Sequence, residues 1–252
     1  MTLYMIGLGL NDEKDISIKG LEAVKKCDYL FLEDYTSKLS VPVEKLEKFY
    51  GKKIFLATRE LVEKRAEEIL DKAIEKNIGF LVIGDVFSAT THVDFFLRAK
   101  AKNIEIKIIH NTSIMNAVGV VGLELYKYGK TTSMPFFEPS LKPETPYDMI
   151  NQNFKFGLHT LVLLDIKKDE NRYMSVNEAI AQLLEIEEKR KQKVFTKSLK
   201  VIGCARLGSD NQLIKYGEVS ELMRYDFGEP LHCLIIPGKL HFMEEEMLKL
   251  WE

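Results

Sequence analysis

Two glycines follow the first apolar segment of the chain, in the stretch Gly7-Leu8-Gly9-Leu10. Without a Cβ they let a ligand approach the backbone, or they simply permit a tight turn between a strand and a helix. A third glycine at position 12 would complete a dinucleotide fingerprint, but Asp12 stands there. A carboxylate near a helix N-terminus would repel a pyrophosphate. The pattern therefore favours a ligand without phosphate, a description that S-adenosylmethionine fits, and a side chain at Gly9 would occupy its space.

A polar turn follows the buried segment that ends at Gly84, and it carries Asp85 and Ser88. Ligands of open α/β sheets bind outside the carboxyl ends of the strands, where these two side chains would project. The Asp85 carboxylate can accept hydrogen bonds from ribose hydroxyls or from an ammonium group. Helix capping by Thr90 explains the same pattern equally well, so both interpretations stay open.

Glu33 and Asp34 end the second apolar segment. An acid at that position holds a ribose in nicotinamide enzymes and in many Rossmann-like methyltransferases. Acids at a strand end are just as often simply solvated. A nicotinamide-dependent dehydrogenase therefore stays an alternative, although Asp12 disfavours it.

Three histidines, His92, His110 and His232, are candidates for acid and base chemistry. None is spaced with acidic residues as in a metal site or a catalytic triad. Each is interpreted as structural, although the ring of His232 should lie near a strand face where it could border a ligand. The sequence assigns no catalytic residue and no metal ligand.

Short apolar segments alternate with amphipathic ones along the whole chain, which is typical of an α/β protein with a mostly parallel sheet covered by helices. The predicted strands span residues 3–6, 29–32, 54–57, 79–85, 104–109, 160–164, 199–204 and 231–236. The predicted helices span residues 16–26, 40–50, 60–76, 90–101, 113–125, 176–189 and 241–251.

A proline-rich stretch interrupts this alternation, since four of the seven prolines fall at positions 135, 139, 143 and 146. Such a stretch can neither continue a helix nor join a central strand. A chain of 252 residues has room for two domains. We expect an N-terminal α/β domain over 1–130, a linker over 131–146 and a C-terminal α/β domain over 147–252.

The composition is that of a globular protein, with 46% hydrophobic and 29% charged residues. A net charge of -2 gives no reason to expect nucleic acid or an anionic membrane as the main partner. The three cysteines lie far apart without metal-site spacing, so we expect reduced, buried thiols. No signal peptide and no apolar span of membrane length is present, which predicts a cytoplasmic protein.

Seven blocks of the sequence resemble, in the same order, those of the diphthine synthases, which are methyltransferases of the diphthamide pathway within the tetrapyrrole methylase fold family. The blocks are LYMIGLGL (3–10), EDYTS (33–37), ATTH (89–92), SIMNA (113–117), LLDIK (163–167), ARLGS (205–209) and PGKLH (237–241). One departure is Val86, where members of this family commonly carry proline, and it leaves the path of the Asp85 turn less defined.

The resemblance implies two α/β domains of the tetrapyrrole methylase type, a cofactor cleft between them, and a homodimer. The implied cofactor is S-adenosylmethionine, which becomes S-adenosylhomocysteine, and no metal is implied. By the same resemblance, and partly through backbone groups, the cofactor contacts fall on Leu10, Asp85, Ser88, Ser113, Ile114, Leu164, Leu207 and His232.

The resemblance also implies a protein substrate, translation elongation factor 2. Its histidine, already extended with a 3-amino-3-carboxypropyl group, would receive successive methyl groups on the amino nitrogen. Methyl transfer to an amine depends mainly on alignment, and solvent can take the proton, so no dedicated base is required.

Three alternatives remain from the sequence. A methyltransferase of the same fold that acts on a small tetrapyrrole is the nearest one. A nicotinamide-dependent dehydrogenase belongs to another reaction class. The third is a catalytically silent partner of elongation factor 2 that only senses S-adenosylmethionine.

Overall fold

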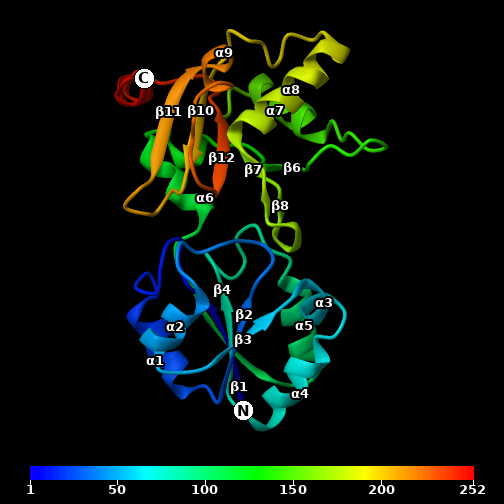
Figure 1. Cartoon of the computed structure of the whole chain (residues 1–252), viewed down its shortest axis with the longest axis vertical. Helices are drawn as coiled ribbons and strands as arrows, with labels where there is room; N and C mark the ends of the chain where they lie inside the picture. Colours follow the sequence, from blue (N-terminus) through cyan, green and yellow to red (C-terminus); the bar gives the residue numbers. More distant parts are fainter. The chain divides into compact units, whose positions relative to one another are not determined.

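The computed structural model describes residues 1–252 and divides them into two compact units, residues 1–117 and 118–252 (Figure 1). Each unit has its own five-stranded sheet; the first unit has a hydrophobic core on each face of its sheet, and the second unit has one core. This division differs from the linker expected over 131–146. That stretch contains strand β6 (Thr132–Met134), which pairs with β7 (Thr160–Leu164) inside the second unit. The first proline of the stretch, Pro135, comes directly after the last residue of β6.

The sheet of the first unit is entirely parallel and has the strand order β3-β2-β4-β1-β5. Its members are β1 (Thr2–Gly7), β2 (Tyr29–Glu33), β3 (Ile54–Ala57), β4 (Ile78–Val82) and β5 (Glu105–Ile109). Every residue of β1 and β4 is buried, as expected for central strands with helices on both faces. Since all five strands run the same way, their carboxyl ends lie along one edge.

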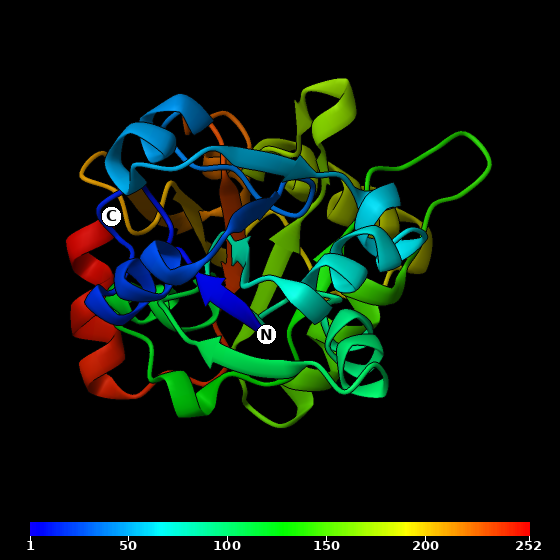
Figure 2. The same ribbon diagram turned by 90° about the horizontal axis from the view of Figure 1, so that it is seen from below.

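Five helices cover the two faces of this sheet (Figures 1 and 2). On one face lie α1 (Ile18–Lys26) and α2 (Val43–Tyr50). On the other lie α3 (Arg59–Glu63), α4 (Glu67–Glu75) and α5 (Val93–Ala101). The side chains of β1 alternate between the two cores, because successive residues of a strand point to opposite faces.

The second unit is built on a mixed sheet with the order β11-β10-β12-β7-β6. Its remaining strands are β10 (Lys200–Ala205), β11 (Leu213–Glu218) and β12 (His232–Ile236). All pairs are antiparallel except β6 with β7. The prediction of a mostly parallel sheet is therefore wrong for this unit. A short connection joins β10 to β11, and neighbouring strands joined so closely must run antiparallel.

Helices α7 (Thr145–Lys155), α8 (Val176–Arg190) and α9 (Val219–Leu222) contribute to the single core of the second unit. A two-stranded hairpin, β8 (Ile166–Lys167) with β9 (Arg172–Tyr173), precedes α8. None of the helices in the chain is long and apolar enough to cross a membrane. The three cysteines are buried and unpaired, as predicted.

Glu244 fixes the last helix, α10 (Phe242–Leu248), to the beginning of the second unit. Its buried carboxylate forms an ion pair with Lys127, accepts the Glu124 amide at 2.9 Å and contacts His159 Nε2 at 3.0 Å. His159 Nδ1 accepts the amide of Gly238 at 2.8 Å, which leaves the ring proton on Nε2. Burial raises the pKa of Glu244, but these contacts outweigh it and hold the pKa at about 2.

Several predicted helices are shorter in the structure. The helix expected over 60–76 is two helices, α3 and α4, separated by residues 64–66. The helix expected over 113–125 is one turn, α6 (Ile114–Ala117), followed by a 3-10 turn over 118–121. The C-terminal helix expected over 241–251 consists of α10 and a final 3-10 turn over 249–251.

Candidate functional site

The loops after β1, β4 and β5 meet at the carboxyl edge of the first sheet. Gly9 and Gly84 exchange main-chain hydrogen bonds of 2.7 and 3.2 Å, which joins the first two loops. The side-chain amide of Asn111, after β5, donates to the carbonyl oxygens of Gly7 and Asp15 at 3.0 and 2.9 Å. The three loops therefore form one connected polar platform.

The side chain of Asp15 hydrogen-bonds to the backbone of the glycine-containing loop after β1. Its carboxylate accepts the amides of Leu10 and Asn11 at 3.1 and 2.7 Å. Gly9 adopts φ +82°, and a Cβ on it would lie 2.5 Å from the Asp15 Cβ. A Cβ on Gly7 would lie 2.7 Å from the Gly84 carbonyl oxygen. Both glycines are required by the chain's own packing, which corrects the expectation that a side chain at Gly9 would fill ligand space.

Asp12 does not lie at a helix N-terminus, contrary to our interpretation of the sequence. Helix α1 begins only at Ile18, and Ser17 caps it by accepting the amide of Gly20. Asp12 instead accepts the amide of Lys14 at 2.8 Å within the turn. Two amides of this loop are instead engaged by the Asp15 carboxylate, which would compete with a phosphate for them.

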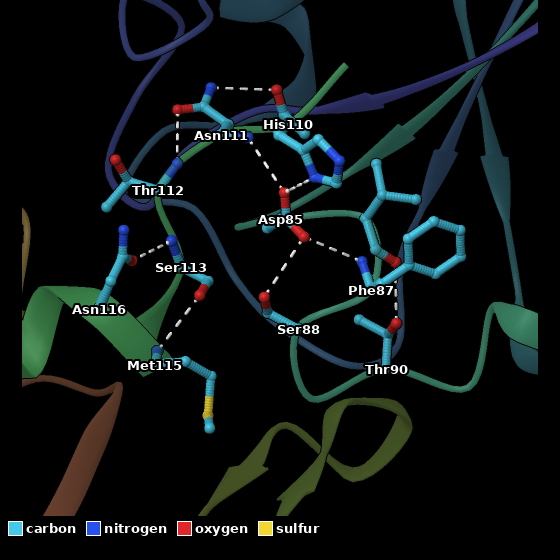
Figure 3. A network of polar contacts seen from close by, with 12 residues as sticks. Asp85, Phe87, Ser88, Thr90, His110, Asn111, Thr112, Ser113, Met115 and Asn116 are labelled. Carbon is cyan, nitrogen blue, oxygen red and sulfur yellow. Dashed lines mark hydrogen bonds and ion pairs between the residues drawn. The ribbon is translucent and has the colours of Figure 1, made fainter. Parts of the chain in front are cut away.

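Asp85 lies at the centre of a hydrogen-bond network (Figure 3). Oδ1 accepts the amide of Phe87 at 3.1 Å and the Ser88 hydroxyl at 3.3 Å. Oδ2 accepts the amide of Asn111 at 3.1 Å and contacts His110 Nδ1 at 2.8 Å. Burial raises the pKa of the Asp85 carboxyl, and the hydrogen bonds outweigh that effect and hold it below its ordinary value. The ionised side chain thus joins the two loops through these hydrogen bonds.

The other predicted site residues of the first unit border this network. Ser113 is buried at the start of α6, and its hydroxyl accepts the amide of Met115 at 3.2 Å. Leu10, Ser88 and Ile114 are half-buried. A Cβ on Gly84 would lie within 4 Å of both Ser113 and Leu10, so the structure brings these loops together.

Val86, the departure from the family pattern, is fully buried in the core of the first unit. Thr90 does not cap α5, since its hydroxyl donates to the carbonyl oxygen of Val86 at 2.8 Å. His92 is also fully buried, with Nδ1 at 3.1 Å from the same oxygen, in agreement with a structural role. The contacts of Thr90 and His92 with the Val86 carbonyl oxygen therefore hold this turn in place, although it contains no proline.

Glu33 is fully buried, and its carboxylate accepts the amide and the hydroxyl of Thr36 at 2.9 and 2.8 Å. A carboxylate engaged in this way shapes the loop after β2, which gives Glu33 a structural role.

His110, which the sequence offered as an acid or base candidate but which we interpreted as structural, is paired with Asp85 in the structure. Its imidazole contacts the Asp85 carboxylate, yet the side chain is 70% exposed. The two residues are 25 positions apart, on loops after different strands, so no local spacing indicates the pair. The only signal in the sequence is that both follow predicted strands whose carboxyl ends share an edge.

The three predicted site residues of the second unit also lie at one edge of their sheet. Leu164 ends β7, Leu207 follows β10, and His232 begins β12 opposite Ala205. Nε2 of His232 lies 3.1 Å from the carbonyl oxygen of Gly228 and 3.0 Å from that of Glu229. Nδ1 of the same ring accepts the amide of Val176 at 3.4 Å. Burial lowers the pKa of His232, and a ring that accepts at Nδ1 and donates from Nε2 is a neutral imidazole.

Comparison with known proteins gives a consistent result. The family model described as "Tetrapyrrole (Corrin/Porphyrin) Methylases" matches residues 2–223. A diphthine methyl ester synthase of Dictyostelium discoideum is 51% identical over 98% of this chain and 96% of its own length. A diphthine synthase of Methanococcus maripaludis is 50% identical over 98% and 97%. A crystal structure of a diphthine synthase superimposes with a TM-score of 0.91 at 36% identity, covering 100% of this chain and 96% of that one. The chain belongs to the tetrapyrrole methylase family, in the branch of the diphthine synthases.

Proposed function

We propose that this protein is the S-adenosylmethionine-dependent methyltransferase that converts the 3-amino-3-carboxypropyl histidine of translation elongation factor 2 into diphthine. The observation that carries the proposal is the sequence identity to diphthine synthases, which is 50–51% over 98% of the chain. The capping of the loop after β1 by Asp15 supports it, because that loop suits a ligand without phosphate.

The proposed cofactor site combines polar loops and apolar side chains, as an adenosine and a methionine moiety require. When bound, the cofactor supplies a methyl group on a sulfonium. We propose that it is held by Gly7, Gly9, Leu10, Asp85, Ser88, Ser113, Ile114, Leu164, Leu207 and His232. The two oxygens of Asp85 already accept four hydrogen bonds from the protein. Asp85 therefore acts by holding its turn in place, and the turn contacts the cofactor.

The test is methyl transfer to elongation factor 2 that bears the unmethylated intermediate, with labelled S-adenosylmethionine as donor. We expect label in the modified histidine and none in factor whose histidine is unmodified. Label on a tetrapyrrole, with none on the factor, would favour the small-molecule alternative. Cofactor binding without any transfer would favour a silent sensor.

A second product deserves a separate measurement, because relatives of nearly equal similarity carry the names diphthine synthase and diphthine methyl ester synthase. The ester would form when a carboxylate of the same substrate group accepts a further methyl. Mass spectrometry of the modified peptide before and after mild alkali distinguishes the products, since alkali removes an ester methyl and leaves the methyl groups on nitrogen.

We further propose a homodimer that acts in the cytoplasm without a metal ion. Support for the dimer is the family resemblance alone. Sedimentation of the purified protein tests the oligomeric state, methyl transfer in the presence of a chelator tests independence from metal, and cell fractionation tests the location.

A further inference from the structure

We infer that His110 is the general base of amine methylation and that Asp85 orients it. The inference rests on the proposed function, since it assumes an amine acceptor. It goes beyond that function because neither the sequence nor the family resemblance assigned a base.

Asp85 determines which nitrogen of His110 carries the proton. The carboxylate oxygen lies 2.8 Å from Nδ1 and has no proton to donate, because its pKa is held low. Nδ1 must therefore donate, which leaves a lone pair on Nε2 of the neutral ring. No protein group hydrogen-bonds to Nε2, and the far edge of the ring is turned away from Asp85 (Figure 3).

The Asp85 carboxylate remains beside the ring during proton transfer. When Nε2 takes a proton, Nδ1 keeps its hydrogen bond to Asp85. Asp85 keeps its position because Phe87, Ser88 and Asn111 all donate to it. Of the other acids on the platform, Asp15 is directed at the amides of Leu10 and Asn11. An exposed ring with one fixed nitrogen and one free nitrogen is the arrangement of an oriented base.

The chemistry needs one proton acceptor for each methyl added to nitrogen. The amine attacks in its neutral form, so an ammonium proton first passes to His110 Nε2. The nitrogen lone pair then forms the new N–C bond, and the electron pair of the broken C–S bond stays on sulfur. The methylated nitrogen is positively charged, and the imidazolium releases its proton to solvent before the next transfer. A carboxylate acceptor has no proton to lose, so ester formation would not need this base.

The decisive variant is His110→Gln, which retains a polar side chain but cannot accept a proton. We expect amine methylation at neutral pH to fall by about 10² to 10⁴, the usual contribution of a general base. The affinity for S-adenosylhomocysteine, measured by calorimetry, should stay within about twofold of wild type. Raising the pH should restore part of the rate, as should free imidazole added to His110→Ala. The matched control is His241→Asn, which removes another exposed imidazole and should leave the rate unchanged.

A second readout does not depend on turnover. Nitrogen-15 NMR of the cofactor-free protein should show His110 protonated on Nδ1, and Asp85→Asn should shift this tautomer. Amine methylation within about threefold of wild type in His110→Gln at neutral pH would overturn the inference and leave the proposed function intact. Equal loss of rate and cofactor affinity would reduce His110 to a structural residue. Failure of the wild-type protein to methylate the modified factor would instead overturn the proposed function.

Discussion

Asp15, Asp85 and Glu33 are acidic residues at the carboxyl edge of the first sheet, and each accepts hydrogen bonds from the protein itself. The amides that they satisfy lie in irregular loops and have no partner in a strand or helix. An unpaired buried amide costs about 1–3 kcal/mol, so each carboxylate is first a stabiliser of its loop. At this scale, the negative charges organise the backbone that a ligand would contact.

Asp85→Asn tests this role. Asparagine keeps one acceptor oxygen, but its amino group would face groups that donate hydrogen bonds to Asp85 in the wild-type protein, so these donors would lose their acceptor. We expect the free energy of unfolding to fall by about 2–3 kcal/mol at pH 7, measured by urea titration. Ser88→Ala is the control and should cost less than 1 kcal/mol, because it removes one 3.3 Å hydrogen bond.

The pH dependence of the same variant has a definite sign. The pKa of Asp85 is lower in the folded protein than its ordinary value of 3.8. Its contribution to stability is therefore fully present above that value and is lost as the pH falls below it. The difference between wild type and Asp85→Asn should shrink below about pH 4. A difference that persists unchanged into that range would contradict the charged network.

Gly9→Ala should destabilise the fold itself. The left-handed conformation that Gly9 adopts costs a residue with a side chain about 1–2 kcal/mol of folding free energy. At Gly9 the new Cβ would also displace Asp15, whereas at Gly51, with φ +67°, it would meet nothing within 4 Å. Thermal unfolding should therefore show a clearly larger loss for Gly9→Ala than for Gly51→Ala. Equal losses would mean that the Asp15 contact contributes nothing.

The sequence located the loops of the candidate site but not the contacts within them. Asp85 and Ser88 are visible because small polar residues follow a buried segment, whereas Ser113 is indicated only by the family resemblance. The partnership of Asp85 with His110 is not visible, since it depends on strands that are neighbours of β1 on opposite sides. The role of Gly9 was misjudged for the same reason, because only the structure shows what fills the space beside it.

At the scale of elements, the sequence predicted all five strands of the first sheet and missed β6, β8, β9 and β11 of the second unit. The strands of the first sheet are short apolar segments buried on both faces, a signal that one sequence carries. Strand β6 has three residues, and β11 is half-exposed with a lysine and a glutamate in it. Such strands are specified by their partners in the sheet, which hydrophobic patterning does not reveal.

Glu244→Gln should loosen α10 from the rest of the second unit. A shift of the Glu244 pKa from 4.5 to about 2 corresponds to about 3 kcal/mol of stability at neutral pH. That contribution is present above pH 4.5 and is lost as the pH falls toward 2. Urea unfolding at pH 7 and pH 4 should show a large cost of the substitution at the higher pH and a smaller one at the lower. Glu245→Gln, on the exposed side of the same helix, should have little effect at either pH.

At the scale of the whole molecule, ligand choice separates the proposed methyltransferase from the dehydrogenase alternative. We expect the purified protein to bind S-adenosylhomocysteine and not NADH, because the Asp15 carboxylate occupies two amides that a pyrophosphate would use. Calorimetry with both ligands measures this directly. Stoichiometric NADH binding with no heat from S-adenosylhomocysteine would contradict the methyltransferase assignment.

The buried contacts of Glu244 also set the order in which the chain can become structured during its synthesis. All strands of the first unit are complete by residue 109, whereas Glu244 is 117 positions beyond its partner Lys127. A ribosome releases the chain from the N-terminus, so the first unit can fold while the second still lacks its final contacts. We expect a nascent chain stalled within β10 to resist protease over its first 117 residues and to be cleaved beyond them. The second unit then becomes protected only after Glu244 has left the ribosome.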